Sequence, residues 1–280
     1  MKLQLDSHAK INLSLDVVRK RDDGYHEIKS IMQQIDLRDF LSISENKNGV
    51  IITCDNDQVP VDESNLVYKA WEELSKLLNT NIGIRVDIKK RIPVAAGLAG
   101  GSTNCATTLK ALNKLWNLGL SEQELTDIGI KIGADVPYCL MGGTALAEGI
   151  GEKLTKLSSF KDKAVLVANP GIQISTAYAY SKLELGKRNY NIKELLECMG
   201  NDDIQCLSKK MYNVMEDSII PEHPQIGKIK EMMISNGALG ALMSGSGASV
   251  FGLYEDLDYL KFAEKKLREE VPFVFSAKTI

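Results

Sequence analysis

Polar and apolar residues alternate along residues 9–17, which predicts a strand with one buried face. The apolar side of this strand would consist of Ala9, Ile11, Leu13, Leu15 and Val17. Its polar side would carry Lys10 and Asn12 together, followed by Ser14 and Asp16. Similar apolar patterns predict further strands at 28–35, 40–43, 49–54, 82–88 and 164–168, and a strand pair around 144–147.

Apolar residues at helical spacing predict helices in both halves of the chain. In the first half one helix covers 65–78, and a second follows a glycine-rich stretch and ends at Asn117. A third begins at the capping box of Ser121 and Glu124. In the second half helices are predicted at 192–199, 203–215, 221–236 and 257–270, with strands at 239–243, 248–253 and 273–277.

The order of these elements indicates the fold class. Strands and helices mix without strict βαβ alternation, which is typical of an α+β protein. A chain of 280 residues can form one large domain or two of ordinary size. The pattern of predicted strands and helices changes near residue 158, so we expect domains at 1–158 and 159–280.

Composition and charge exclude several classes of protein. The formal net charge of −3 argues against a protein that coats nucleic acid, and apolar runs stay far below the roughly 18 residues that span a bilayer. Cys54, Cys105, Cys139, Cys198 and Cys206 form no C-x-x-C pair, and the three histidines are too scattered for a zinc-protease motif. The start at Met1–Asp6 turns polar too soon for a signal peptide, so we expect a cytoplasmic protein with reduced thiols.

The glycine-rich stretch from Pro93 to Asn104 is the most informative local feature. Gly97, Gly100 and Gly101 would let backbone N–H groups turn toward one ligand, and the following helix would aim its positive N-terminus at the same point. Cations at 89–91 lie just upstream, so the segment suits a polyphosphate. Neither the Walker A nor the dinucleotide spacing is present. Taken alone, the stretch is equally compatible with a flexible connector.

Lys10 and Asp135 are the candidate catalytic residues. Phosphoryl transfer to an alcohol needs a carboxylate near the hydroxyl and a fixed cation near the transferring group. Read in isolation, Lys10 is compatible with a solvated sheet face, and Asp135 with a simple helix cap. Cys105 falls at a helix start, where its pKa could be lowered, and is interpreted as structural.

Five motifs in order resemble the GHMP kinase superfamily. They are Ala9-Lys10-Ile11-Asn12-Leu13, Asp23-Gly24-Tyr25-His26, the stretch 93–104, Gly133-Ala134-Asp135-Val136-Pro137 and Gly240–Gly247. The first two together resemble the branch whose substrate is 4-diphosphocytidyl-2-C-methyl-D-erythritol, in non-mevalonate isoprenoid synthesis. The likeness covers residues 9 to about 253. Ala99 stands where many members have Gly, and Cys105 where Ala is usual; both are small.

The resemblance implies a fold and a set of site residues. The fold would pair an N-terminal mixed α/β sandwich with a C-terminal ferredoxin-like α+β domain, with the active site between them. Lys10 and Asp135 would be catalytic. ATP would be bound by Asn65, near the adenine, and by Pro93, Val94, Ala95, Ala96, Gly97, Leu98, Ala99, Gly100, Gly101, Ser102, Thr103 and Asn104. The cytidine substrate would be bound by Asn12, Tyr25, His26, Tyr180 (Tyr178 as second choice), Gly245, Ser246 and Gly247.

The implied activity is an ATP-dependent phosphotransferase with an alcohol acceptor. Mg²⁺ is expected with ATP, with Ser102 and Thr103 as candidate ligands. The partners would be small molecules, ATP and a cytidine diphosphate sugar alcohol, with no nucleic acid and no membrane. Three alternatives stay open: another small-molecule kinase of the superfamily, acting on galactose or homoserine, a nucleotide- or RNA-binding module without catalysis, and a purely structural protein.

Overall fold

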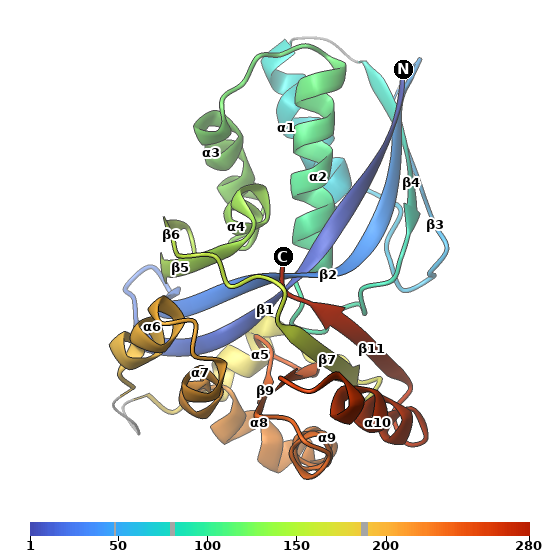
Figure 1. The fold of residues 1–280 in the computed structure, drawn as a ribbon. Coiled ribbons are helices and arrows are strands. Elements are labelled where there is room, and N and C mark those ends of the chain that lie inside the picture. The colour runs from blue at the N-terminus through green and yellow to red at the C-terminus, as the bar shows by residue number, and fades with distance from the viewer. Residues whose placement is uncertain (48, 79–81, 186–189) are drawn as a thin grey trace. The chain divides into compact units, whose positions relative to one another are not determined.

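The computed structural model describes residues 1–47, 49–78, 82–185 and 190–280 (Figure 1). The chain forms two compact units, each discontinuous in sequence. The first unit consists of Met1–Ala9, Leu37–Val94 and Ala99–Gly142, and the second of Lys10–Asp36, Ala95–Leu98 and Gly143–Ile280. The expected sequence boundary at residue 158 stays a prediction, because these units do not divide the chain at a single point.

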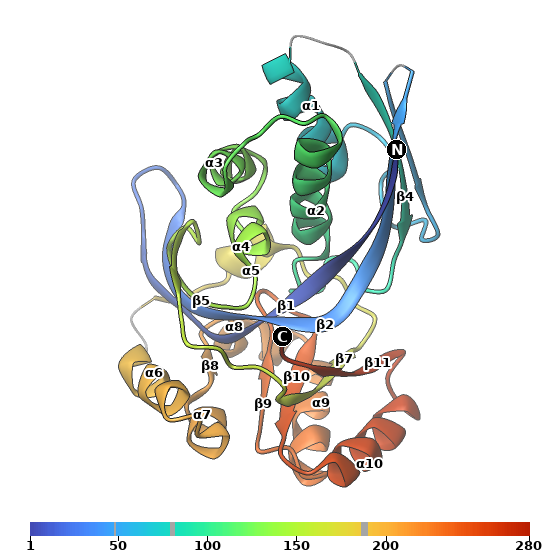
Figure 2. The same cartoon turned by 45° about the horizontal axis from the view of Figure 1, so that its top comes forward.

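The first unit combines sheet strands with a group of helices. The end of β2 (His26–Asn46) pairs antiparallel with β4 (Gly83–Lys89), and β3 (Val50–Cys54) pairs parallel with β4. The helices α1 (Leu66–Leu78), α2 (Gly100–Leu115), α3 (Glu122–Ile132) and α4 (Val136–Met141) pack against one another (Figure 2). The predicted capping box starts α3, with Ser121 and Glu124 bonded reciprocally.

The second unit holds most of β1 (Lys2–Lys20) and the start of β2. There β2 pairs with β5 (Thr144–Gly149), β5 with β6 (Lys153–Lys156), and β1 with β8 (Tyr212–Asn213). The other described strands form a sheet in the order β11-β7-β10-β9, from Phe273–Lys278, Ala164–Asn169, Val250–Tyr254 and Gly240–Met243. Every pairing in this sheet is antiparallel.

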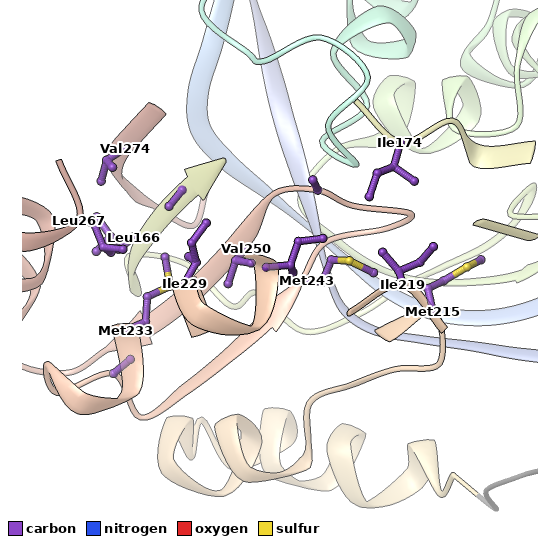
Figure 3. Packing of buried hydrophobic residues seen from close by; sticks show 14 of the residues in the cluster. Leu166, Ile174, Met215, Ile219, Ile229, Met233, Met243, Val250, Leu267 and Val274 are labelled. Carbon is purple, nitrogen blue, oxygen red and sulfur yellow. The ribbon is translucent and has the colours of Figure 1, made fainter. Parts of the chain in front are cut away.

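The helices of the second unit lie between its strands along the chain, and two of them pack on that sheet. The helices are α5 (Thr176–Ser181), α6 (Ile192–Gly200), α7 (Ile204–Lys210), α8 (Glu216–Glu222), α9 (Pro224–Ser235) and α10 (Leu257–Arg268). α9 packs on β9 and β10, while α10 packs on β7 and β11. The buried side chains between them form a continuous core that includes Leu166, Ile229, Met233, Val250 and Leu267 (Figure 3).

Most predicted elements are confirmed, and several are wrong in extent. The strand expected at 9–17 is part of the longer strand β1, Lys2–Lys20. The strands expected at 28–35 and 40–43 are one long strand, β2. The helix expected at 203–215 ends at Lys210 and is followed by β8. The helix expected at 221–236 is α9, which begins only at Pro224; the separate helix α8 ends before it, and His223 lies between them. The return between 239–243 and 248–253 is confirmed as the antiparallel pair β9–β10.

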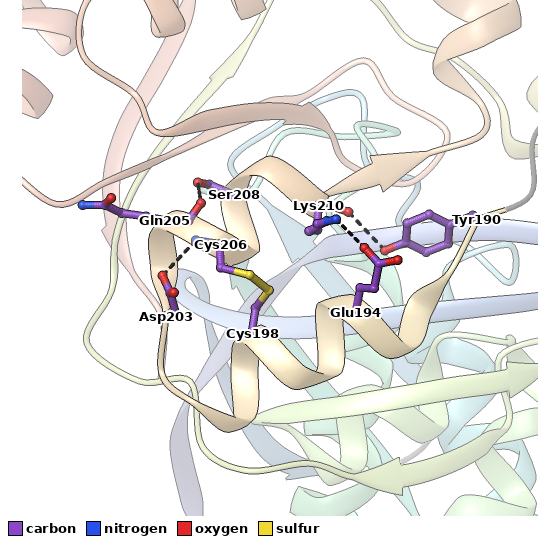
Figure 4. Close-up of a disulfide and its surroundings, with 8 residues drawn as sticks. All are labelled: Tyr190, Glu194, Cys198, Asp203, Gln205, Cys206, Ser208 and Lys210. Carbon is purple, nitrogen blue, oxygen red and sulfur yellow. Dashed lines mark hydrogen bonds and ion pairs between the residues drawn. A yellow bond between two sulfur atoms is a disulfide. The ribbon is translucent and has the colours of Figure 1, made fainter.

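The expectation that all five cysteines are reduced is wrong for two of them. Cys198 on α6 and Cys206 on α7 form a disulfide, with Cα atoms 5.6 Å apart (Figure 4). Cys54, Cys105 and Cys139 are free thiols. The C-x₇-C spacing of the pair carries no recognisable motif, so the sequence did not indicate it. No helix in the described ranges is both long and apolar enough to cross a membrane. The cytoplasmic location stays a prediction.

Candidate active site

Residues Ala99–Asn104 place the N-terminus of α2 in the first unit. Ala99 occupies the cap position with a positive φ of 56°, and its methyl side chain cannot cap the first N–H groups of α2. Gly100 is required by packing, because a Cβ there would lie 2.8 Å from Lys90 Nζ and 3.1 Å from Ile92 Cγ2. Binding of a phosphate at this helix start stays a prediction.

A buried carboxylate fixes the chain just before the glycine-rich loop. Asp39 Oδ1 accepts hydrogen bonds from the backbone N–H groups of Arg91 at 2.7 Å and Ile92 at 2.8 Å, and Oδ2 pairs with Lys90 Nζ. The Asp39 side chain is fully buried and that of Lys90 is 5% exposed. Burial lowers the pKa of Lys90, against the opposing effect of Asp39. Lys90 is therefore engaged with Asp39, and Lys89 and Arg91 are the exposed cations of this segment.

Two residues predicted to bind ATP already hold structural bonds. Asn65 caps α1: its Oδ1 accepts from Val67 N, and its Nδ2 donates to the carbonyl of Pro60. Leu66, which follows it, lies beside Gly101. Asn104 is buried, and its Oδ1 accepts from the Ser7 hydroxyl at 2.8 Å. These bonds fix the local backbone, and contact of either residue with ATP stays a prediction.

Cys105 follows this loop on α2 and is fully buried. Burial raises the pKa of its thiol to about 12. Desolvation therefore outweighs the lowering that a helix N-terminus could provide.

Asp135 lies at the start of α4 in the first unit, where Pro137 follows within the first turn. It occupies the cap position, yet its side chain makes no capping hydrogen bond to the described residues of α4. Asp135 therefore lies at the expected cap position, without the side-chain bond that usually accompanies a helix cap. The half-buried carboxylate belongs to the same unit as the start of α2.

Lys10 lies on β1 in the second unit and is only 5% exposed. The interpretation as a solvated sheet face is therefore wrong. Its ammonium donates to Asn12 Oδ1 at 2.7 Å, and Asn12 Nδ2 donates to the Ser30 hydroxyl at 2.8 Å.

The second glycine run packs on the middle of the first glycine-rich loop, and both segments belong to the second unit. Ser244 Oγ donates to the carbonyl of Gly97 at 2.9 Å and accepts from Asn12 N at 3.3 Å. Ser249 N donates to the carbonyl of Ala96. Asn213 Nδ2 donates to the carbonyl oxygens of Met243 at 2.7 Å and Gly245 at 2.8 Å. Ser244 and Asn213 therefore hold two loops whose glycines the motif singled out.

Of the aromatic residues predicted to bind the cytidine, two contact each other. The His26 and Tyr180 rings stack with centroids 4.7 Å apart. Burial lowers the pKa of His26, and the nearby charge of Lys20 lowers it further. Tyr25 is 59% exposed. Tyr178, the second choice, is hydrogen-bonded to Glu222 instead.

The structure brings together Lys10, Asn12, Gly97 and the 245–247 segment through the contacts of Ser244 and Asn213. Lys10 and Asp135 belong to different units, and their pairing stays a prediction. Sequence reasoning missed Asp39, Ser30 and Asn213 as supports of the site, and named Ser244 only within a motif. A polar residue inside an apolar strand pattern was the available signal for Asp39 and Ser30. Within the described ranges, no group of three or more His, Cys, Asp or Glu residues could hold a metal ion.

Comparison with known proteins gives the family. Residues 65–143 match the model for the N-terminal domain of GHMP kinases, and residues 182–272 match the model for their C-terminal domain. A homoserine kinase from Cytophaga hutchinsonii shares the fold, with a TM-score of 0.80 at 19% identity, over 100% of this chain and 97% of that one.

Relatives of higher identity carry one name. The 4-diphosphocytidyl-2-C-methyl-D-erythritol kinase of Clostridium botulinum (strain Alaska E43) is 44% identical over 99% of this chain and 100% of the relative. That of Clostridium novyi is 45% identical over 98% and 99%. A crystal structure of 4-(cytidine 5'-diphospho)-2C-methyl-D-erythritol kinase matches with a TM-score of 0.84 and 29% identity, over 99% of each chain. The chain therefore belongs to the GHMP kinases, and within them to the family of 4-diphosphocytidyl-2-C-methyl-D-erythritol kinases.

Proposed function

We propose that this protein transfers the γ-phosphate of ATP to the 2-hydroxyl of 4-diphosphocytidyl-2-C-methyl-D-erythritol, giving ADP and the 2-phosphate product. The reaction belongs to the non-mevalonate synthesis of isoprenoid precursors. The observation that carries the proposal is the 44% identity to kinases of this name over their whole length. The burial of Lys10, a cation at a motif position of the family, supports it.

The stretch 93–104 is proposed to hold the ATP phosphates. The uncapped start of α2 supplies N–H donors and the positive end of the helix dipole. Asp39 holds the backbone at residues 91 and 92, just before the stretch, and Ser244 holds the carbonyl of Gly97 in its middle. Preorganised donors of this kind lose little entropy when an anion binds.

Lys10 and Asp135 are proposed as the catalytic pair. Asp135 would take or orient the proton of the acceptor hydroxyl, as its place in the motif 133–137 implies. Lys10 would stabilise the charge on the transferring group, since its ammonium is fixed by Asn12. Asn12 would then act through Lys10 in addition to its expected contact with substrate.

His26 and Tyr180 are proposed to recognise the cytidine. The neutral imidazole offers one donor and one acceptor, which suits the edge of cytosine. The ring of Tyr180 offers a flat face for stacking, and its packing on His26 supports Tyr180 over Tyr178. Tyr25 and the backbone of 245–247 are proposed to complete this site.

Mg²⁺ is proposed to enter with ATP. It would neutralise charge on the β- and γ-phosphate oxygens, and such sites need few protein ligands because phosphates and water supply the rest. The hydroxyls at the start of α2 are oxygen donors of the kind that Mg²⁺ prefers. Thr103 is only 2% exposed, whereas Ser102 is half-buried, so Ser102 is the better-placed ligand.

A substrate panel with one variant tests the proposal. The protein should phosphorylate 4-diphosphocytidyl-2-C-methyl-D-erythritol, and should leave galactose and homoserine unchanged. Asp135→Ala should lower kcat by at least roughly 10³-fold while ATP binding persists in calorimetry. Phosphorylation of homoserine or galactose alone would make this another GHMP kinase, and a near-normal kcat of Asp135→Ala would remove that residue from the mechanism.

A further inference from the structure

Ser30 is a buried serine on β2 that no motif includes. Its hydroxyl donates to the carbonyl oxygen of Ser14 at 2.6 Å and accepts from Asn12 Nδ2 at 2.8 Å. Asn12 in turn accepts from Lys10 Nζ at 2.7 Å. Ser30 is fully buried, Asn12 is 1% exposed and Lys10 is 5% exposed, so water does not compete for these bonds.

The direction of each bond follows from the number of protons. A serine hydroxyl has one proton, and Ser30 donates it to the carbonyl oxygen of Ser14, which can only accept. The Ser30 oxygen can then only accept from Asn12. Asn12 must therefore present its NH₂ group to Ser30 and its oxygen to Lys10. The reverse orientation of the amide would place NH₂ protons against the Lys10 ammonium and leave two acceptors, Asn12 Oδ1 and Ser30 Oγ, facing each other.

We propose that Ser30 is a positioning residue of the kinase: it sets the orientation of the Asn12 amide and, through it, the position of the Lys10 ammonium. The proposal rests on the proposed catalytic role of Lys10. The backbone N–H of Asn12 is bonded to Ser244 Oγ, so the main chain at Asn12 is fixed independently of its side chain. Ser30 therefore acts on Lys10 through the side chain of Asn12, while its own proton holds the carbonyl oxygen of Ser14.

Ser30→Ala is the primary variant, and Ser14→Ala is its matched control. Ser14 is equally buried on the neighbouring strand, and its hydroxyl accepts from Ile31 N, while its carbonyl is kept in the alanine variant. We expect Ser30→Ala to lower kcat roughly 10- to 100-fold, since a displaced catalytic group costs about that much. Both KM values should stay within about twofold of the parent enzyme. Ser14→Ala should lower the melting temperature to a similar degree and leave kcat within about twofold.

Two further variants separate orientation from general damage. Ser30→Thr keeps a hydroxyl and should restore kcat to within about threefold of the parent. An Asn12→Asp background removes the need for orientation, because a carboxylate presents oxygen to Lys10 whichever way it lies. Adding Ser30→Ala to Asn12→Asp should therefore change kcat by less than about threefold, a coupling that a double-mutant cycle measures.

Lys10→Met, measured in parallel, distinguishes failure of the proposal from failure of the proposed function. If Lys10→Met is inactive and folded Ser30→Ala keeps its kcat, or loses it equally in both Asn12 backgrounds, the relay is overturned and the function stands. If Lys10→Met keeps its kcat, both the role of Lys10 and the relay are overturned. Should Ser30→Ala not fold, Ser30→Cys replaces it, because a thiol keeps the volume but accepts hydrogen bonds weakly, and the same outcomes apply.

Discussion

The Ser244 hydroxyl donates to the carbonyl oxygen of Gly97 at 2.9 Å, and the backbone of Ser244 leaves no room for a side chain at Gly97. A Cβ on Gly97 would lie 1.9 Å from the Ser244 carbonyl oxygen and 2.9 Å from its carbon. Gly97 also has a φ of +75°, which L residues rarely adopt. Glycine is therefore required at 97 by contact and by backbone conformation together.

Gly97→Ala should destabilise the protein and disrupt ATP binding. The clash involves backbone atoms, which cannot rotate away, so the loop must move; we expect a loss of about 3 kcal/mol or more in the free energy of unfolding. The measurement is urea denaturation combined with calorimetric titration of ATP.

Gly119→Ala is the matched control for Gly97→Ala. Gly119 has a similar φ of +67°, but no described atom lies within 4 Å of its ideal Cβ position. The conformational strain alone should cost about 1 kcal/mol and leave ATP affinity unchanged. Equal losses of stability and affinity in both variants would contradict the packing argument.

Asp39→Asn should weaken ATP binding, although Asp39 is buried. Its carboxylate holds the backbone just before the glycine-rich loop. The change leaves the Lys90 ammonium buried without its carboxylate, which costs about 3–5 kcal/mol when a buried pair is broken. The two N–H groups of Arg91 and Ile92 lose a charged acceptor as well. We expect the KM for ATP to rise more than the KM for the alcohol, as steady-state kinetics would show.

The double variant Asp39→Asn/Lys90→Met is the control for that prediction. Removing both charges abolishes the desolvation penalty of the unpaired ammonium, so stability should recover most of the loss. If the double variant is as unstable as the single one, the loss comes from the backbone hydrogen bonds of Asp39 and the ion pair contributes little.

Acid pH should weaken binding of the cytidyl substrate before it weakens binding of ATP. Burial and Lys20 hold the pKa of His26 below its ordinary 6.5, so the imidazole is neutral at pH 7. A lowered pKa means that the neutral form is favoured in the folded state, and it is lost as pH falls through that lowered pKa. The KM for the cytidyl substrate should therefore rise as the pH falls through the lowered pKa of His26, with the KM for ATP unchanged. In His26→Gln, which does not titrate, this acid rise should be absent.

The elements of the fold were largely predictable because their local signals are strong. Alternation in β1, the capping box at Ser121 and the turn between β9 and β10 act over a few residues. Position 212 shows the limit of such signals. Tyr212 and Asn213 continue a helical pattern in sequence, yet pair with Ser14 and Leu15 of a distant strand. Tertiary pairing there overrides local preference.

The candidate site was predictable where a motif marks it and not where distant residues support it. Lys10, Asn12 and Gly97 were predicted as site residues from motifs. Asn213 and Ser30 act through residues that are distant along the chain: Asn213 contacts Gly245, 32 positions away, and Ser30 contacts Asn12, 18 positions away. Such contacts exist only once the fold forms. The Cys198–Cys206 disulfide belongs to the same class, because its geometry depends on the packing of α6 against α7.

Reduction of the Cys198–Cys206 disulfide should lower stability while sparing the three free thiols. The bridge closes a short loop between α6 and α7, and loop-closure entropy assigns such a bridge about 2–3 kcal/mol. Cys198→Ser should therefore lower the urea midpoint to that of the reduced parent, and added dithiothreitol should then have no further effect.

Cys54→Ser, at a half-buried free thiol, is the control and should keep the full response to reductant. Glu194 and Lys210 pair between the same two helices, so the helices should stay docked after reduction (Figure 4). A parent protein whose denaturation is unaffected by dithiothreitol would show that the bridge contributes nothing to stability.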